Sequence, residues 1–140
     1  MESEIVREVM TSNPVTVGSR QTLVEAAQLM RDHGIGDVIV ADDAELVGIL
    51  TDRDIVVRAV ADAREMTQTE VGAVCTRDVA SIGPDDAADN AVELMSNKAI
   101  RRLPVVDEGK VVGVVVLGDL AVDREPKSAL ADISVATPNN

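Results

Sequence analysis

Thr51 and Asp54, two polar side chains at the end of a short apolar stretch, are the residues of this chain best placed to do chemistry. They lie where an expected strand (46–50) opens into an expected helix (52–63), and such junctions are common ligand sites in α/β proteins. A carboxylate there can accept hydrogen bonds from two neighbouring hydroxyl groups together. The same spacing is close to a capping box, which stabilises a helix start without any ligand. The two interpretations are compatible, so the pair is both a candidate helix cap and a candidate ligand contact.

The elements that must position this pair follow from the hydrophobic pattern. Short apolar runs predict strands at 15–17, 37–41 and 46–50, and apolar residues at helical spacing predict helices at 3–10, 22–33 and 52–63. Gly34 is expected to end the second helix. The acidic run 42–45 indicates a solvated hairpin turn between two strands.

The same frame returns 65 residues later without a gap. Comparing residues 6–55 with 71–120, 13 of 50 positions are identical, and ten others exchange one aliphatic residue for another. Each repeat is predicted to be a β-α-β-β-α unit preceded by a short helix. Neither repeat is large enough to bury both faces of its sheet alone, so we expect the two to pack together.

Charge and composition exclude several classes of function. The net charge of −12 argues against non-specific nucleic-acid binding, which depends on cationic contacts to phosphates. The absence of Phe, Tyr and Trp removes the usual platform for stacking bases. No segment has the length of apolar sequence that spans a membrane, and the N-terminus lacks the features of a signal peptide. We therefore expect a cytoplasmic protein that binds neither nucleic acid nor membrane.

Cysteine and histidine are too few for the common catalytic and metal sites. The single cysteine, Cys75, excludes an internal disulfide and a Cys-based zinc site, and its apolar repeat position indicates a small core residue. The single histidine, His33, lies at an expected helix end, and no Ser-His-Asp or Cys-His set has a recognisable spacing. The sequence therefore predicts no enzyme activity, no catalytic residues and no metal site.

Several features of the two repeats resemble a tandem pair of cystathionine-β-synthase-type (CBS) motifs, which together are called a Bateman module. They are a helix ending in Leu-Met (29–30 and 94–95), a strand such as Leu103-Pro104-Val105-Val106-Asp107, and a strand leading into the Thr-x-x-Asp segment at 51–54. The resemblance covers residues 5–122. It implies an α/β (α+β) fold with two β-α-β-β-α repeats packed about a pseudo-two-fold axis. The expected division is 1–70 for repeat one with its N-terminal helix and linker, 71–124 for repeat two, and 125–140 for a C-terminal tail.

In that family the cleft between the repeats can bind AMP, ADP, ATP or S-adenosylmethionine. The resemblance implies that Asp54 takes the ribose hydroxyls, with Thr51 as a neighbouring hydroxyl, and it implies no required cofactor. The candidate ligand-binding residues are Thr16, Val17, Val38, Ile39, Thr51, Arg53, Asp54, Ser81, Arg101, Arg102, Leu103, Pro104 and Asp119.

The second repeat departs from the family pattern. Val116 stands where the family usually has Ser or Thr, so only Asp119 remains there to meet a ribose. Arg101 and Arg102, with Lys98, form the tightest basic cluster of the chain, and they could serve a phosphate of a ligand bound from repeat one. Alternatively, they are solvated cations near a helix C-terminus, which the helix dipole favours.

The sequence thus predicts a regulatory module that senses an adenosine compound. The alternative is a ligand-free structural or interaction module that regulates a protein partner, which the sequence does not identify. The resemblance also implies a homodimer formed through helices, for which Val24, Val56 and Val60 are candidate interface residues.

Overall fold

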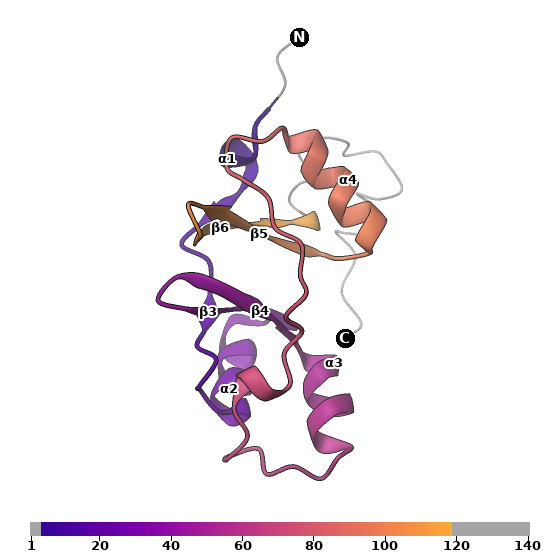
Figure 1. Ribbon diagram of the computed structural model, residues 1–140. Coiled ribbons are helices and arrows are strands. Elements are labelled where there is room, and N and C mark those ends of the chain that lie inside the picture. The colour runs from indigo at the N-terminus through magenta and orange to yellow at the C-terminus, as the bar shows by residue number, and fades with distance from the viewer. Residues whose placement is uncertain (1–3, 119–140) are drawn as a thin grey trace. The chain divides into compact units, whose positions relative to one another are not determined.

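The computed structural model describes residues 4–118 and divides into two compact units. The first-repeat unit comprises Val15–Val79, and the second-repeat unit combines, among the described residues, 4–14 with 80–118. Asp119 and the expected tail 125–140 lie outside the described residues. The mixed α/β composition and the predicted repeat are both confirmed (Figure 1).

The first-repeat unit is built on a hairpin of β3 (Asp37–Asp42) and β4 (Glu45–Thr51). The short strand β2 (Thr16–Val17) adds to β3 in parallel, and Thr76 pairs with Ile49 on the other side of the hairpin. Asp43 and Ala44 both have positive φ at the turn, which is the backbone of a tight two-residue hairpin.

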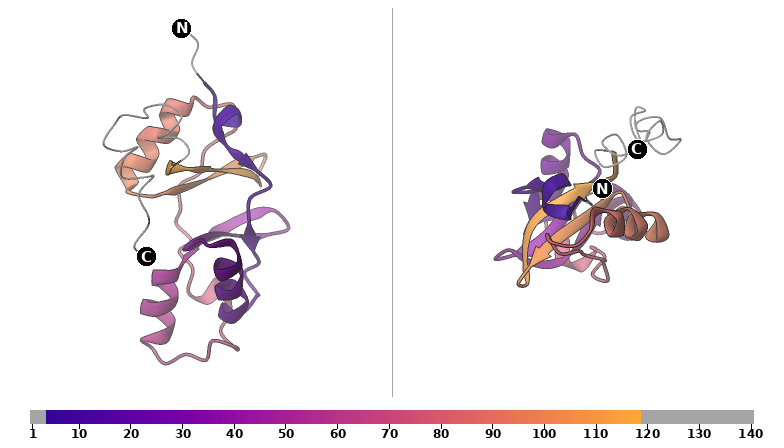
Figure 2. Two further views of the ribbon diagram at one scale, coloured as in Figure 1. Left: turned by 180° about the vertical axis from the view of Figure 1, so that it is seen from behind. Right: turned by 90° about the horizontal axis from the view of Figure 1, so that it is seen from above.

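Helices cover one side of this hairpin, as the two opposite views show (Figures 1 and 2). Helix α2 (Leu23–His33) begins at a capping box, in which Thr22 Oγ1 accepts from the Glu25 amide and Glu25 Oε1 accepts from the Thr22 amide. It ends at Gly34, whose φ of 65° is left-handed, as predicted. The short helix η2 (Val71–Ala73) also belongs to this unit.

The third expected helix forms, but with an unexpected geometry. It starts as one turn, α3 (Asp52–Asp54), and continues as the π-helical segment η1 (Ile55–Val60). The run Ile55-Val56-Val57 consists of β-branched residues, which lower the propensity for a regular α-helix. A hydrophobic pattern indicates that a helix forms but does not specify its hydrogen-bond register.

The core of this unit lies between the helices and one face of the strands. It is formed by buried aliphatic side chains and the thiol of Cys75: Val17, Leu23, Ala26, Met30, Val38, Val40, Leu50, Ala59, Val71, Val74 and Cys75. Burial raises the pKa of the Cys75 thiol, so the side chain stays protonated. The prediction that Cys75 is a core residue is confirmed.

The second-repeat unit repeats this layout. Strands β5 (Arg102–Asp107) and β6 (Lys110–Val116) form an antiparallel hairpin, Ile82 pairs in parallel with Val105, and β1 (Thr11–Ser12) pairs with β6. Helices α1 (Val6–Val9) and α4 (Ala88–Lys98) contact each other. The core contains Val6, Ile82, Ala91, Met95, Leu103, Val105 and Val115.

The compact units do not coincide with the two sequence repeats, whose expected division at residue 70 stays a prediction. The segment before repeat one, with α1 and β1, packs within the second-repeat unit, and residues 71–77 pack within the first-repeat unit. Thr11 and Thr76 are equivalent in the repeat, and so are the positions they pair with, Val114 and Ile49. Each hairpin is therefore completed by the segment that precedes the other repeat.

Candidate functional site

The junction between β4 and α3 forms the capping box that the spacing of Thr51 and Asp54 predicts. The Asp54 amide donates to Thr51 Oγ1 at 3.0 Å, and the Thr51 amide donates to Asp54 Oδ2 at 3.0 Å. The two side chains thus satisfy two backbone donors at the helix start. The capping interpretation is confirmed.

The two carboxylate oxygens of Asp54 have different partners. Oδ2 is taken by the Thr51 amide, whereas Oδ1 lies 3.8 Å from Nε of Arg58, an ion-pair distance rather than a hydrogen bond. The Asp54 side chain is 13% exposed, so it is largely shielded but reachable from solvent. A carboxylate held by one oxygen is oriented in advance, and its other oxygen can accept from ligand hydroxyls.

The remaining first-repeat candidates divide between the two faces of the strands. Val17 and Val38 belong to the core cluster, so their side chains are used in packing against the helices. Side chains alternate along a strand, so Ile39 lies on the opposite face, where Thr16 is its partner in β2 and Ile49 its partner in β4. Thr51 shares that face with Ile49 because Leu50, between them, points into the core.

The first-repeat unit therefore brings Thr16, Ile39, Ile49 and Thr51 to one face beside Asp54. Thr16 is exposed, Ile39 is buried, and the Arg53 side chain is exposed at the start of α3. This combination of hydroxyl groups, aliphatic surface and one oriented carboxylate suits a ligand that has both an apolar ring system and neighbouring hydroxyls. Ile49 was not among the predicted site residues, although its alternation with Leu50 could have indicated it.

The second-repeat candidates gather at the equivalent place in their own unit. Arg102 pairs with Val116 in the β5–β6 hairpin, as Asp37 pairs with Thr51 in β3–β4. The Leu103 side chain is in the core, Pro104 is also buried, and Ser81 and Arg101 are exposed. Val116 has no side-chain oxygen with which to cap a helix. The expected approach of Arg101 and Arg102 to a ligand held by Asp54 stays a prediction.

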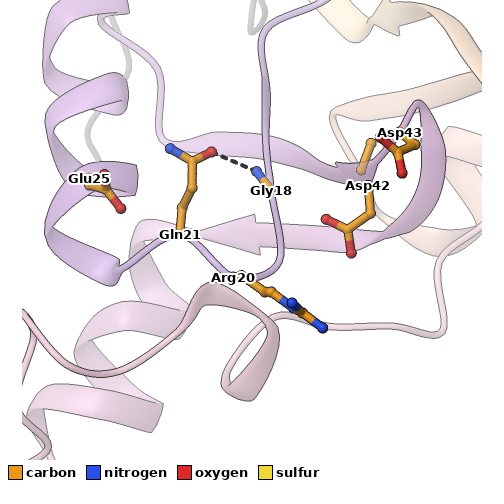
Figure 3. Close-up of a pocket in the computed structure, with 7 residues that line it drawn as sticks. Gly18, Arg20, Gln21, Glu25, Asp42 and Asp43 are labelled. Atoms are coloured by element: carbon orange, nitrogen blue, oxygen red, sulfur yellow. Dashed lines mark hydrogen bonds between the residues drawn. The ribbon is translucent and has the colours of Figure 1, made fainter.

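A separate hollow lies at the hairpin end of β3, away from the β4–α3 junction (Figure 3). It has a volume of about 690 Å³ and is lined by Gly18, Arg20, Gln21, Glu25, Ala41, Asp42 and Asp43, none of which was predicted as a site residue. Asp42 accepts from the amide and the hydroxyl of Ser19, at 2.9 and 2.6 Å, and Gln21 Oε1 accepts from the Gly18 amide at 2.8 Å.

The polar groups around this hollow mainly hold the local backbone. The Ser19 hydroxyl, followed by the Ser19 amide, lowers the pKa of Asp42 below its ordinary value of 3.8. The acidic run 42–45 is exposed, as expected of a solvated turn, but Asp42 also ties the loop after β2 to the end of β3. Gly18 and Gly83 are equivalent in the repeat, and the amide of each donates to the side chain three residues later, Gln21 and Asp86 respectively. This recurrence could have indicated that the polar side chains of the loop hold its backbone.

With this geometry established, comparison with known proteins defines the class. The CBS domain family model matches residues 6–60 and 71–122, so the chain belongs to the CBS domain family and carries a tandem pair. A CBS domain-containing protein of Bacillus subtilis, YhcV, is 42% identical over 133 residues, which cover 92% of this chain and 94% of that protein. Hypoxic response protein 1 of Mycobacterium tuberculosis is 34% identical over 116 residues, covering 82% of this chain and 81% of the relative.

Two solved structures share the fold closely. A crystal structure of Hypoxic Response Protein I with two coordinated zinc ions has a TM-score of 0.78, with 32% identity, 84% of this chain covered and 97% of that one. The CBS domain pair of protein MJ0100, in complex with 5′-methylthioadenosine and S-adenosyl-L-methionine, has a TM-score of 0.77, with 29% identity, 91% of this chain covered and all of the other.

Within residues 4–118 of the present chain, no three His, Cys, Asp or Glu side chains are grouped so as to hold a metal ion. No helix in this described part is long and apolar enough to cross a membrane.

Proposed function

We propose that this chain is a regulatory module that binds an adenosine compound through the first-repeat junction, with the Asp54 carboxylate taking the ribose hydroxyls. The observation that carries the proposal is the asymmetry of this carboxylate. Oδ2 is fixed by the Thr51 amide at 3.0 Å, whereas Oδ1 lies 3.8 Å from Nε of Arg58, beyond hydrogen-bond distance. The complex of the MJ0100 CBS domain pair with two adenosine compounds supports the ligand class.

The surroundings of Asp54 suit recognition rather than catalysis. Thr16 offers an exposed hydroxyl and Ile49 a half-buried aliphatic side chain on the same face as Thr51. YhcV, which this chain matches over 94% of its length, is named only as a CBS domain-containing protein. A bound ligand regulates only if it favours one arrangement of the module over another. The candidate ligands are AMP, ADP, ATP and S-adenosylmethionine. The net charge of −12 works against the polyphosphates at long range.

The test is a calorimetric titration of dialysed protein with AMP, ATP and S-adenosylmethionine. We expect one of these to bind the wild type and to lose at least about tenfold in affinity in Asp54→Ala, since a charge-assisted hydrogen bond contributes about 1.5–3 kcal/mol. Asp52→Ala is the matched control, because Asp52 is a first-turn carboxylate that accepts only from the adjacent Arg53 amide among the hydrogen bonds described. Thr51→Ala removes the cap hydroxyl but keeps the carboxylate, so a smaller loss of affinity than in Asp54→Ala would assign the larger part of binding to the carboxylate.

Equal affinity in Asp54→Ala and the wild type would remove Asp54 from the site. Binding to none of the compounds, checked by thermal shift with an extrinsic dye, would favour a second function: a ligand-free module that regulates a protein partner. Two observations favour that alternative. In the second repeat, Val116 stands at the position equivalent to Thr51, and Val56, Val57 and Val60 are exposed on η1.

We further propose that the chain forms a homodimer through η1.

A further inference from the structure

The side chain of Arg58 links the proposed ligand carboxylate to a distant part of the chain. Its Nε lies 3.8 Å from Asp54 Oδ1, four residues earlier, and its Nη1 donates to the Val74 carbonyl at 3.1 Å. Arg58 lies on the π-helical segment η1, which begins directly after Asp54. Such segments are rare and are found frequently at functional sites.

The backbone that Arg58 reaches is firmly held to the first-repeat strands. Thr76 exchanges two hydrogen bonds with Ile49 of β4, both at 2.9 Å, and the Cys75 amide donates to the Val71 carbonyl at 3.0 Å. Arg77 Nη2 donates to the Gly72 carbonyl at 2.9 Å. The 71–77 segment is thus an ordered part of the unit, and it is also the stretch of chain that leads from repeat one into repeat two.

We infer that Arg58 is a positioning residue that orients Oδ1 of Asp54 and couples ligand binding there to the 71–77 segment. This inference rests on the proposed function. Oδ1 is the oxygen that the cap does not fix, so the guanidinium is the described group that restrains it. A ligand hydroxyl that donates to Oδ1 shares this oxygen with Arg58, which on its other side holds the Val74 carbonyl.

The chemistry of the guanidinium makes this a role for arginine rather than lysine. Its donors point in fixed, different directions, so Nε can face a carboxylate while Nη1 donates to a carbonyl. A lysine ammonium is a point charge that can keep the ion pair but does not reproduce the fixed fork. Arg58→Lys and Arg58→Gln therefore separate the two contacts: the lysine variant keeps the charge beside Asp54, and the glutamine variant removes it.

The test combines binding with amide hydrogen exchange on the full chain. AMP and S-adenosylmethionine are the probes, and 2′,3′-dideoxy-AMP is the analogue without ribose hydroxyls. We expect Arg58→Gln to lower the affinity of the hydroxyl-bearing probes roughly three- to fivefold, as befits a half-exposed ion pair. Its affinity for the dideoxy analogue should not change. In an Asp54→Asn background, Arg58→Gln should have no further effect.

Amide hydrogen exchange tests whether ligand binding at Asp54 is coupled to the 71–77 segment. Saturating probe should slow exchange of the 71–77 amides in the wild type but not in Arg58→Gln, and Arg58→Lys should restore affinity without restoring this protection. Without any probe, Arg58→Gln should already speed exchange at residues 74–76. Arg31→Gln, which removes an exposed arginine paired with Asp32, is the matched control and should behave as wild type.

The outcomes distinguish this inference from the proposed function. If the wild type binds neither probe, both the proposed function and the coupling to a ligand are overturned. Amide hydrogen exchange of the unliganded protein then still decides whether Arg58 restrains the 71–77 segment. If Asp54→Ala abolishes binding but Arg58→Gln binds and protects as wild type does, only the role of Arg58 is overturned. The role of Arg58 would also be overturned if Arg58→Gln lowered the affinity by the same factor in the wild-type and Asp54→Asn backgrounds.

Discussion

At the residue scale, the carboxylates at the two ends of the β3–β4 hairpin have different partners. Asp54, at the junction, divides its oxygens between the Thr51 amide and Arg58, whereas Asp42, at the hairpin turn, uses both oxygens on Ser19. Asp54 therefore keeps an oxygen for a ligand, while Asp42 is committed to its own loop. This difference, rather than the size of the nearby hollow, leads us to place the candidate site at Asp54.

Asp42 should make the stability of the protein depend on acid pH. Its pKa is lowered from 3.8, chiefly by the Ser19 hydroxyl, so its pKa is lower in the folded than in the unfolded chain. The ionised carboxylate then stabilises the fold above pH 3.8, and this contribution is lost as the pH falls from 3.8 through the lower folded value. Ser19→Ala removes the largest cause and should reduce this acid-induced loss.

The measurement is urea unfolding followed by far-ultraviolet circular dichroism at pH 7 and at a series of values below 4, since the chain has no aromatic residue for fluorescence. Ser12→Ala, at an exposed serine of β1, is the control. A pH dependence in Ser19→Ala identical to that of the wild type would contradict the assigned cause.

At the element scale, two glycines let a neighbouring segment lie against each hairpin. A Cβ atom at Gly48 would overlap the carbonyl oxygen of Thr76, and one at Gly113 would lie 2.6 Å from Met10 Sδ and 2.9 Å from the Thr11 carbonyl oxygen. The two glycines are equivalent in the 65-residue repeat, and so are the segments that approach them. Glycine is needed at these positions because the backbones meet there, and both are buried.

Gly48→Ala should destabilise the protein by about 1–3 kcal/mol, the usual cost of overpacking, because the atom it meets is backbone and cannot rotate away. Gly18→Ala is the matched control in the same unit, since its Cβ would meet nothing closer than 3.6 Å and Gly18 has no positive φ. Urea denaturation midpoints of both variants provide the measurement. Equal midpoints for Gly48→Ala and the wild type would show that the 71–77 segment can move away from β4 at little cost.

The elements themselves were largely predictable, because hydrophobic period and turn residues determine them locally. Helix α2, with its Thr22 cap and Gly34 end, and both strands of the first hairpin lie within a residue or two of their expected bounds. The π-helical register of η1 was not predictable, because the same stripe of aliphatic residues suits more than one helix type. At the site, the Thr51–Asp54 cap followed from spacing, but the contact of Arg58 with Val74 depends on tertiary structure.

At the scale of the whole molecule, the repeat does not determine which hairpin each preceding segment pairs with, and the structure shows which pairing occurs. Thr11 and Thr76 are equivalent, and so are Ile49 and Val114, so each preceding segment matches the hairpin of its own repeat as well as the hairpin of the other. In the structure, Thr76 pairs with Ile49 and Thr11 with Val114. Sequence periodicity could not distinguish these pairings because both satisfy the same pattern. The exchange means that each compact unit depends on chain from both repeats.

The exposed helix η1 carries the prediction about assembly. Val56, Val57 and Val60 are 58%, 48% and 55% exposed, and they are the large hydrophobic side chains left most open to solvent in the described chain. Contiguous apolar side chains on a surface mark interaction sites, and the proposed homodimer would bury them against a second copy. The prediction for Val24 is weaker, because its side chain is already half-buried on α2.

Val57→Glu should therefore convert a dimer into a monomer of 14.8 kDa, since a charge at the centre of an apolar interface is left unpaired and desolvated. Sedimentation equilibrium at several protein concentrations measures the mass directly. Gln68→Glu adds the same charge at an exposed position outside the helices and should remain dimeric. A wild type that sediments as a monomer would contradict the homodimer itself. A Val57→Glu variant that stays dimeric would show instead that the copies meet through another surface, leaving the valines of η1 available to a different protein partner.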